Sequence, residues 1–233
     1  MKKKSVAVFK CLIDFIFPRH CYGCRNTLEF YEKNLCLGCQ IKLPHTSLHL
    51  THKNLLYEQL KFRIPLEAAT SLFYFEKNGV LAHLIHLLKY SGEKKIGAFL
   101  GSWLGDHLEE SPFFNEIDGI VPVPLHPVKK RKRGYNQADL IAHALSKKIN
   151  SPVLSKILIR VKNTSALAQL GESEREQEVQ NAFELNSNRL NHPQHLLLVD
   201  DVLTTGATLI ACANALAKNG NIKLSIAVLA CRL

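Results

Sequence analysis

The 233-residue sequence lacks the patterns that mark several large classes of protein. No apolar stretch reaches the roughly 18 residues that a membrane-spanning helix needs, so no segment is expected to insert stably into a membrane. The patterns G-x-G-x-x-G and G-x-x-x-x-G-K-S/T are also missing, which leaves dinucleotide-binding and P-loop functions without a motif. Acidic residues are scarce: 20 stand against 30 lysines and arginines, giving a net charge of +10. That excess favours anionic partners, namely phosphorylated small molecules, nucleic acid or an acidic membrane face.

A secretory signal is missing as well. Lys10 and Asp14 interrupt the apolar residues at the start, and no small-residue cleavage site follows, so residues 5–17 are expected to form a short amphipathic helix. The odd number of cysteines, seven, argues against a disulfide framework and for a reducing compartment. The sequence therefore predicts a cytoplasmic protein, which its basic residues could bring to the inner face of the membrane.

Three regions follow one another along the chain: a cysteine-rich head (1–45), a connector (46–70) and a body (71–233). In the body, strand-like and helix-like segments alternate, and Asn136 is a good candidate to cap one of the helices. Strands are expected at 70–75, 117–123, 195–199 and 222–230, and helices at 78–90, 95–109, 136–149 and 207–219. This alternation predicts an α/β fold, an open parallel sheet with helices on both faces.

The most informative segment is LLLVDDVLTTGAT at residues 196–208. A buried strand would end at Asp200 and Asp201, whose carboxylates can accept hydrogen bonds from sugar hydroxyls. The loop that follows would begin a helix, and a helix N-terminus offers unpaired N–H groups and partial positive charge to a phosphate. The residues expected to hold that phosphate are Thr204, Thr205, Gly206, Ala207 and Thr208. The segment predicts a ribose 5-phosphate site, and the alternative is an ordinary capped helix with two acids in a turn.

Five consecutive basic residues follow a proline-rich loop. They are Lys129, Lys130, Arg131, Lys132 and Arg133. Such a run could neutralise a diphosphate or follow a single strand of nucleic acid, with Tyr135 as a face on which bases stack. A solvated surface is the usual role of a basic run, and these interpretations stay open.

Four cysteines of the head form two C-x-x-C pairs separated by eleven residues. Each pair makes a tight turn that points two thiolates at one centre, so Cys21, Cys24, Cys36 and Cys39 are expected to hold a structural zinc ion. Four protein ligands leave no open position for catalysis, and the binding energy would help to fold a small head. Cys11, Cys212 and Cys231 are expected to be buried thiols.

The segment at 196–208 resembles the phosphoribosyl-pyrophosphate (PRPP) binding motif of type I phosphoribosyltransferases, and the wider pattern resembles the ComF family. The matching pieces are the cysteine-rich head, LKYSG (88–92), VPVPLH (121–126), KRGYNQA (132–138), NAF (181–183) and the loop itself. The resemblance implies that PRPP binds with Mg²⁺ and that Pro124, Leu125 and His126 form a pyrophosphate loop. It also implies a flexible loop with Arg160, Lys162 and Thr164, although the glutamine that commonly follows this threonine three residues later is replaced by Leu167.

The sequence therefore predicts two alternative functions. The first is an enzyme that transfers a phosphoribosyl group to an unknown acceptor and releases pyrophosphate, without a glutaminase domain. The second, which the ComF resemblance implies, is a single-stranded-DNA-binding protein of DNA uptake during natural competence. It would use the zinc module and the basic run, and its PRPP site would be regulatory or vestigial. A sensor of phosphoribosyl ligands without turnover is a third possibility.

Overall fold

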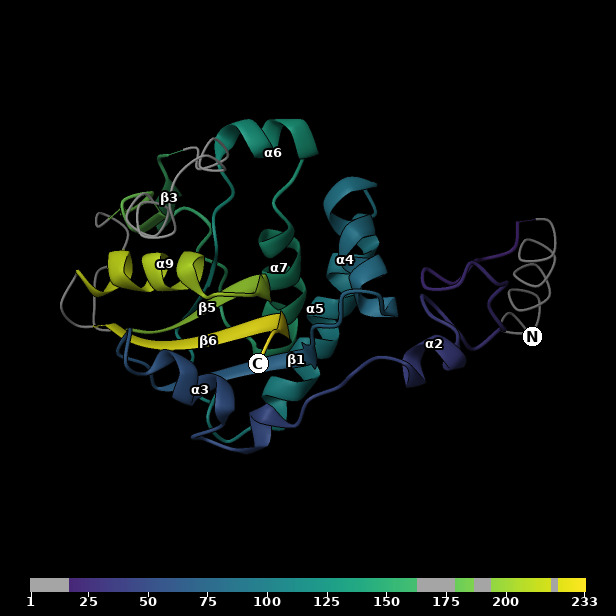
Figure 1. The fold of residues 1–233 in the computed structure, drawn as a ribbon, viewed down its shortest axis with the longest axis horizontal. Helices are drawn as coiled ribbons and strands as arrows, with labels where there is room; N and C mark the ends of the chain where they lie inside the picture. The colour runs from purple at the N-terminus through teal and green to yellow at the C-terminus, as the bar shows by residue number, and fades with distance from the viewer. Residues whose placement is uncertain (1–16, 163–178, 187–193, 219–221) are drawn as a thin grey trace, which may run out of the picture.

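The computed structural model describes residues 17–162, 179–186, 194–218 and 222–233 (Figure 1). Four parallel strands form the central sheet in the order β1-β6-β5-β2. They are β1 (Ala68–Tyr74), β2 (Gly119–Pro122), β5 (Gln194–Leu203) and β6 (Ile222–Cys231). The fold is thus the expected α/β arrangement with a parallel sheet between helices.

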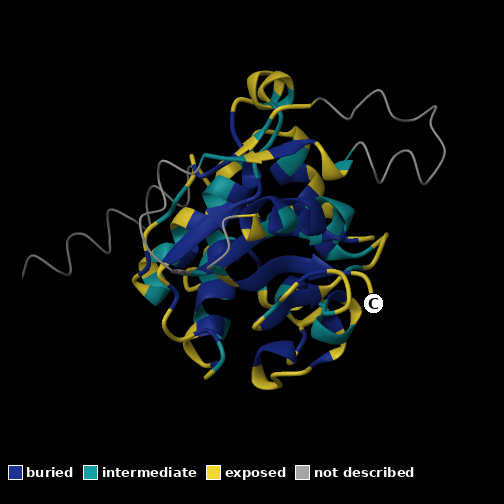
Figure 2. Cartoon of the chain, turned by 90° about the vertical axis from the view of Figure 1, so that its left-hand side faces the viewer, coloured by how far each residue is buried: buried dark blue, intermediate teal, exposed yellow. Residues whose placement is uncertain are grey.

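Successive side chains of a strand point to opposite faces of the sheet, and helices cover both faces. The sheet is therefore buried on both sides. In β5, Leu197 and Val199 join one apolar cluster, whereas Leu196 and Leu198 join the other. The first cluster is completed by α4 (Val80–Tyr90), α5 (Lys94–Glu109) and α7 (Gln137–Ile149), and the second by α3 (Leu55–Leu60) and α9 (Ala207–Ala217). Figure 2 shows the strands coloured as buried, as a continuous apolar run predicts.

Two helices on the first face approach each other closely. A side-chain carbon on Gly101 of α5 would lie 2.6 Å from the backbone oxygen of Ile141 in α7. One on Gly105 would lie 2.7 Å from Lys148. Glycines on one side of α5 therefore allow the two backbones to pack together.

The head contains α2 (Leu37–Ile41) and packs against the body beside α4 (Figure 1). A side-chain carbon on Gly23 would lie 3.1 Å from Val80 at the start of α4. Cys21, Leu35 and Cys39 belong to the same apolar cluster as α4 and α5. The head therefore shares its core with the body.

Three further pieces complete the described chain. Residues 46–70 contain η1 (Leu48–Leu50) and α3, whose apolar side chains enter the second cluster. A separate antiparallel pair consists of β3 (Leu158–Arg160) and β4 (Phe183–Leu185). The basic run forms a short helix, α6 (Pro127–Arg133).

The elements expected in the body are confirmed, with shifts at their ends. Strand β5 continues beyond the expected end at Val199, because Asp200 and Leu203 remain in register with Val228 and Cys231 of β6. The side chain of Asn136 caps α7 as expected, accepting a hydrogen bond from the N–H of Ala138. The amphipathic helix expected at 5–17 lies outside the described residues apart from Phe17.

Among the described residues, no helix combines the length and the hydropathy that crossing a lipid bilayer requires.

Candidate functional site

The loop after β5 leads directly into α9. Thr204 and Thr205 are exposed, and Gly206 caps the helix with a φ of 78°, a left-handed conformation that glycine adopts without strain. The hydroxyl of Thr205 accepts a hydrogen bond from the N–H of Ala207 at 3.5 Å. The N-cap residue, Gly206, has no side chain that could accept a further one. The N-terminus of α9 therefore faces the exposed loop, with Ala207 and Thr208 half-buried beside it.

The two acids at the end of β5 lie in different environments. Asp201 is 3% exposed, and one of its carboxylate oxygens, Oδ1, pairs with Nζ of Lys89 at 2.9 Å. Its other oxygen, Oδ2, is buried and has no hydrogen-bond partner within the described parts of the chain. A buried oxygen without a donor is costly, so this atom is a natural acceptor for a ligand hydroxyl.

Asp200 is half-buried, and its Oδ1 accepts the backbone N–H of Asp201 at 2.8 Å. Burial and then the negative charge of Asp201 raise the pKa of Asp200 to about 7, while the charges of Lys89 and Arg160 act in the opposite sense. The carboxyl group thus changes its charge near neutral pH, and a ligand that donates hydrogen bonds to it would favour the charged form.

The proline-rich turn follows β2, the sheet neighbour of β5. The N–H of Val123 donates to the carbonyl of Val199 at 2.9 Å, and the side chain of Asn136 donates to the carbonyl of Val123 at 2.9 Å. Pro124, Leu125 and His126 come next and are half-buried. Because parallel strands end at the same edge of a sheet, this turn and the loop after β5 share that edge.

His126 begins α6, since its Nδ1 accepts the N–H of Val128 at 3.3 Å. With Nδ1 as an acceptor, the neutral ring carries its proton on Nε2. The helix ends at Gly134, which has a φ of 83°. Capping at both ends accounts for the short helix that the five basic residues form, for which the sequence predicts no particular structure.

Arg160 and Lys129 approach this edge from β3 and α6. The charge of Arg160 interacts with that of Asp200. Burial, followed by the charges of Arg160 and Arg133, lowers the pKa of Lys129. The structure thus brings Arg160 to Asp200 and Lys129 to Arg160. Lys162 is exposed, and Thr164 lies outside the described residues.

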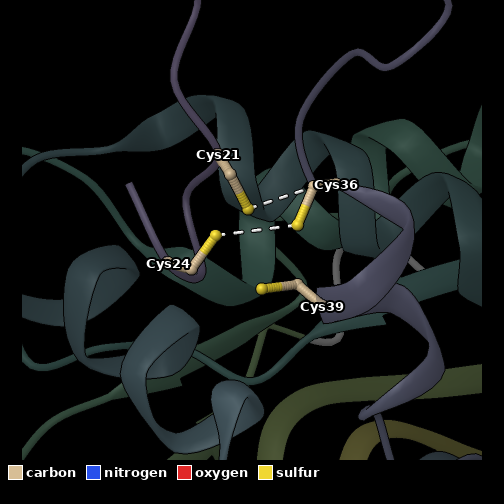
Figure 3. Close-up of side chains that lie close together, drawn as sticks. All are labelled: Cys21, Cys24, Cys36 and Cys39. Atoms are coloured by element: carbon tan, nitrogen blue, oxygen red, sulfur yellow. Dashed lines mark hydrogen bonds between the residues drawn. The ribbon is translucent and has the colours of Figure 1, made fainter. Parts of the chain in front are cut away.

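The four cysteines of the head point toward a common centre (Figure 3), and their sulfur atoms all lie within 4.8 Å of one another. The N–H groups of Gly23 and Cys36 donate to Sγ of Cys21 at 3.3 Å each, contacts that stabilise a thiolate. Cys24 and Cys36 have their sulfurs 3.6 Å apart. The group can therefore hold one metal ion such as zinc, with every position taken by protein. Cys212 and Cys231 are buried, as expected, and Cys11 lies outside the described residues.

No family model matches the chain. The chain is 31% identical over 216 residues to Competence protein F of Haemophilus influenzae, and the match covers 88% of this chain and 93% of that protein. The chain belongs to the ComF family. This ComF-family chain is also 29% identical over 217 residues to DNA utilization protein YhgH of Escherichia coli, covering 87% of this chain and 92% of the relative. It is 25% identical over 201 residues to Competence protein ComFC of Bacillus subtilis, covering 86% and 78%.

One expectation for the ComF-family chain is wrong. Tyr135 is only 7% exposed, its hydroxyl donates to the carbonyl of Leu88, and Lys94 covers its ring at 5.3 Å from the centroid. Tyr135 therefore packs inside the protein and offers no face to a base. The aromatic ring that is exposed beside the basic helix is Tyr90, at 71%.

For Lys89, which precedes Tyr90, the sequence allows either a contact with an anion or the favourable end of a helix. The structure pairs Lys89 with Asp201. Its place in the LKYSG piece was the available signal. The ion pair itself could not be predicted, because 111 positions separate the two residues along the chain.

Proposed function

We propose that this protein binds PRPP, or a related ribose 5-phosphate ligand, at the end of β5 and transfers its phosphoribosyl group to an acceptor. The observation that carries the proposal is the buried, unpartnered Oδ2 of Asp201 beside the glycine-capped start of α9. In this site Asp200 and Asp201 accept the ribose hydroxyls. The 5-phosphate takes the N–H groups and hydroxyls of residues 204–208.

The same edge supplies charge for the diphosphate. The turn 124–126 would carry the pyrophosphate, with Mg²⁺ bound to the ligand, and Arg160 lies close enough to Asp200 to interact with it electrostatically. In the transfer, the bond from the ribose C1 to the diphosphate oxygen breaks, pyrophosphate leaves with the bonding electrons, and a nucleophile bonds to C1. Catalysis consists of positioning and of stabilising the departing charge.

Isothermal titration with PRPP and Mg²⁺ tests the site. Asp201→Asn is expected to weaken binding at least about tenfold, because it removes the charge that the ribose hydroxyls and Lys89 share. Asp106→Asn on α5 is the matched control, since it removes one negative charge paired with Lys148 outside the site. Equal affinity in the two variants would exclude the assignment. Pyrophosphate release measured across candidate acceptors then separates a transferase from a sensor.

We further propose that residues 1–45 form a zinc module, residues 46–70 a connector and residues 71–233 the phosphoribosyltransferase-like domain. The module's metal is a structural Zn²⁺ held by the four cysteines. Metal analysis of the purified protein is expected to find about one zinc per chain. Cys24→Ser is expected to lower both the zinc content and the melting temperature. A wild-type protein that kept its melting temperature after its metal was removed would exclude a structural zinc.

The second candidate function is the binding of single-stranded DNA in natural competence. The names of the relatives, which refer to competence and to DNA utilization, support a role of this kind. The specific observation in its favour is α6, in which the five basic residues follow one another on a short helix with no buried side chain.

Gel shifts with single-stranded DNA over a salt series test this function. Replacing residues 129–133 by glutamine is expected to weaken binding and to make the salt dependence shallower, since fewer counterions are released. A wild-type protein that binds no single strand at low salt would contradict it.

A further inference from the structure

A cavity of about 520 Å³ opens between the end of α4 and the basic helix α6, which lie next to each other in the upper part of Figure 1. One side is formed by Lys89, Tyr90 and Gly92. The other side is formed by Val128, Lys129, Lys132 and Arg133. The ribose site proposed above does not include this cavity, although Lys89 contributes to both.

The lining is strongly basic and has few counter-charges. Lys89 pairs with Asp201, whereas no carboxylate forms an ion pair with Lys129, Lys132 or Arg133 anywhere in the described ranges. The charges of Arg160 and Arg133 act on Lys129, so these cations lie close enough to repel one another. Anionic groups in the cavity would relieve that repulsion.

Tyr90 adds an aromatic surface to the cations. Its side chain is 71% exposed, and the guanidinium of Arg133 lies 5.6 Å from the centre of its ring. Arg133 is half-buried and donates a hydrogen bond to Gln137, so its guanidinium is held beside the exposed ring. An aromatic ring and a guanidinium are the two groups on which nucleic-acid bases stack, while lysines beside them suit phosphates.

We propose that this cavity holds a base of a single nucleic-acid strand, stacked on Tyr90 and Arg133, with the flanking phosphates on Lys129 and Lys132. This inference rests on the proposed DNA binding and names where one nucleotide of the strand lies. A strand fits better than a free mononucleotide because Arg131, and Lys130 beside its partner Asp139, continue α6 past the residues that line the cavity.

The chain offers a matched control for the aromatic contact. Phe62 is 86% exposed, and Nζ of Lys61 lies 4.8 Å from the centre of its ring. This pair is likewise a cation beside an exposed aromatic ring, but it does not line the cavity. Because both aromatic side chains are well exposed, neither replacement removes core packing.

Fluorescence anisotropy with an oligothymidylate and with an abasic strand of the same length tests the proposal. Tyr90→Leu is expected to weaken oligothymidylate binding about fivefold or more, to leave abasic-strand binding unchanged and to preserve the salt dependence. Tyr90→Trp and Phe62→Leu are expected to bind oligothymidylate at least as well as the wild type. Thymidine monophosphate is expected to compete only weakly.

Two results would overturn the inference while leaving DNA binding intact: equal oligothymidylate affinity in Tyr90→Leu and Phe62→Leu, or an equal loss for the abasic strand. Strong competition by the mononucleotide would replace the strand with a free nucleotide as the occupant. If the wild-type protein bound neither strand, the DNA-binding function itself would fail, which distinguishes the two failures.

Discussion

Among single residues, Asp200 determines how the proposed ribose site responds to pH. Its pKa of about 7 means that its charge is gained as the pH rises from about 6 to about 8. The fraction ionised then increases from roughly one tenth to roughly nine tenths, and only the ionised group accepts hydrogen bonds with all its lone pairs. PRPP affinity is expected to rise about ninefold over this range.

Asp200→Asn provides the control for this pH dependence, because the ionisation of PRPP itself is common to both proteins. Titrations at several pH values should give a ratio of wild-type to variant affinity that increases with pH. A ratio that stays constant would show that Asp200 does not take part in binding as a carboxylate.

A second prediction concerns how stability depends on pH, and it comes from the histidines of η1 and α5. Burial lowers the pKa of His49, and burial with the charges of His49 and His45 lowers that of His107. Their rings lie 4.3 Å apart between centroids, and Nδ1 of each is buried without a hydrogen-bond partner in the described chain. Glu110, 3.8 Å from His49, and Asp106 act in the opposite direction.

These lowered pKa values determine how the free energy of unfolding changes with pH. Above about pH 6.5 these histidines are neutral in both states, and below it the unfolded chain takes up protons that the folded chain does not. The free energy of unfolding is therefore expected to fall as the pH decreases from about 6.5. In denaturant titrations, His107→Gln should reduce this slope and the exposed His83→Gln should not. An unchanged slope in both variants would contradict the role of the cluster.

On the scale of elements, the packing of α5 against α7 gives a prediction about glycine. In Gly101→Ala the new methyl would meet the backbone oxygen of Ile141 at 2.6 Å and its Cα at 2.8 Å, and backbone cannot rotate aside. Overpacking of this kind is expected to cost about 1–3 kcal/mol of unfolding free energy, although alanine favours a helix.

Gly38→Ala in α2 is the comparison, because nothing lies within 4 Å of the added carbon. It is expected to be neutral or slightly stabilising in the same thermal melts. If both variants lost stability equally, the close approach of α5 and α7 would not be the cause.

Some of these elements can be predicted from local sequence patterns, and others cannot. The apolar run before Asp200 predicted a strand buried on both faces, and the period of leucines in α4 predicted its helix. By contrast, β3 and β4 have three residues each and are made by pairing with each other, which no local pattern reveals. The helix α6 was missed because its basic residues have no apolar face, and capping by His126 and Gly134 defines its ends.

For the site, the acidic pair and the glycine loop after an apolar run predict a ribose 5-phosphate site, and this stays a prediction. The contacts that join distant segments cannot be predicted in this way, because they depend on how the sheet orders its strands. The burial of Tyr135 against Leu88 and the exposure of Tyr90 follow from tertiary packing, so the wrong aromatic ring was assigned to the basic run.

For the whole molecule, Lys89 links the two proposed sites, since it lines the cavity and pairs with Asp201. A strand in the cavity that also contacts Lys89, besides Lys129 and Lys132, would draw Lys89 away and leave both oxygens of Asp201 to ribose hydroxyls. The two ligands are therefore expected to strengthen each other's binding. The effect should be about fivefold and, by linkage, the same in both directions. PRPP titrations with and without oligothymidylate measure it.

Lys89→Met is expected to abolish that coupling, because it removes the only charge in the cavity lining that is ion-paired to Asp201 in the described structure. Coupling that survived in this variant would assign the link to another residue. Independent binding in the wild type would mean that the sites do not communicate.

The central claim, that the loop after β5 holds a ribose 5-phosphate group, is tested most directly by amide chemical-shift mapping with ribose 5-phosphate. We predict saturable shifts of the backbone N–H signals of residues 204–208, which are lost in Asp200→Asn/Asp201→Asn. Shifts confined to the basic residues 129–133, or no saturable shift in the loop, would contradict the account.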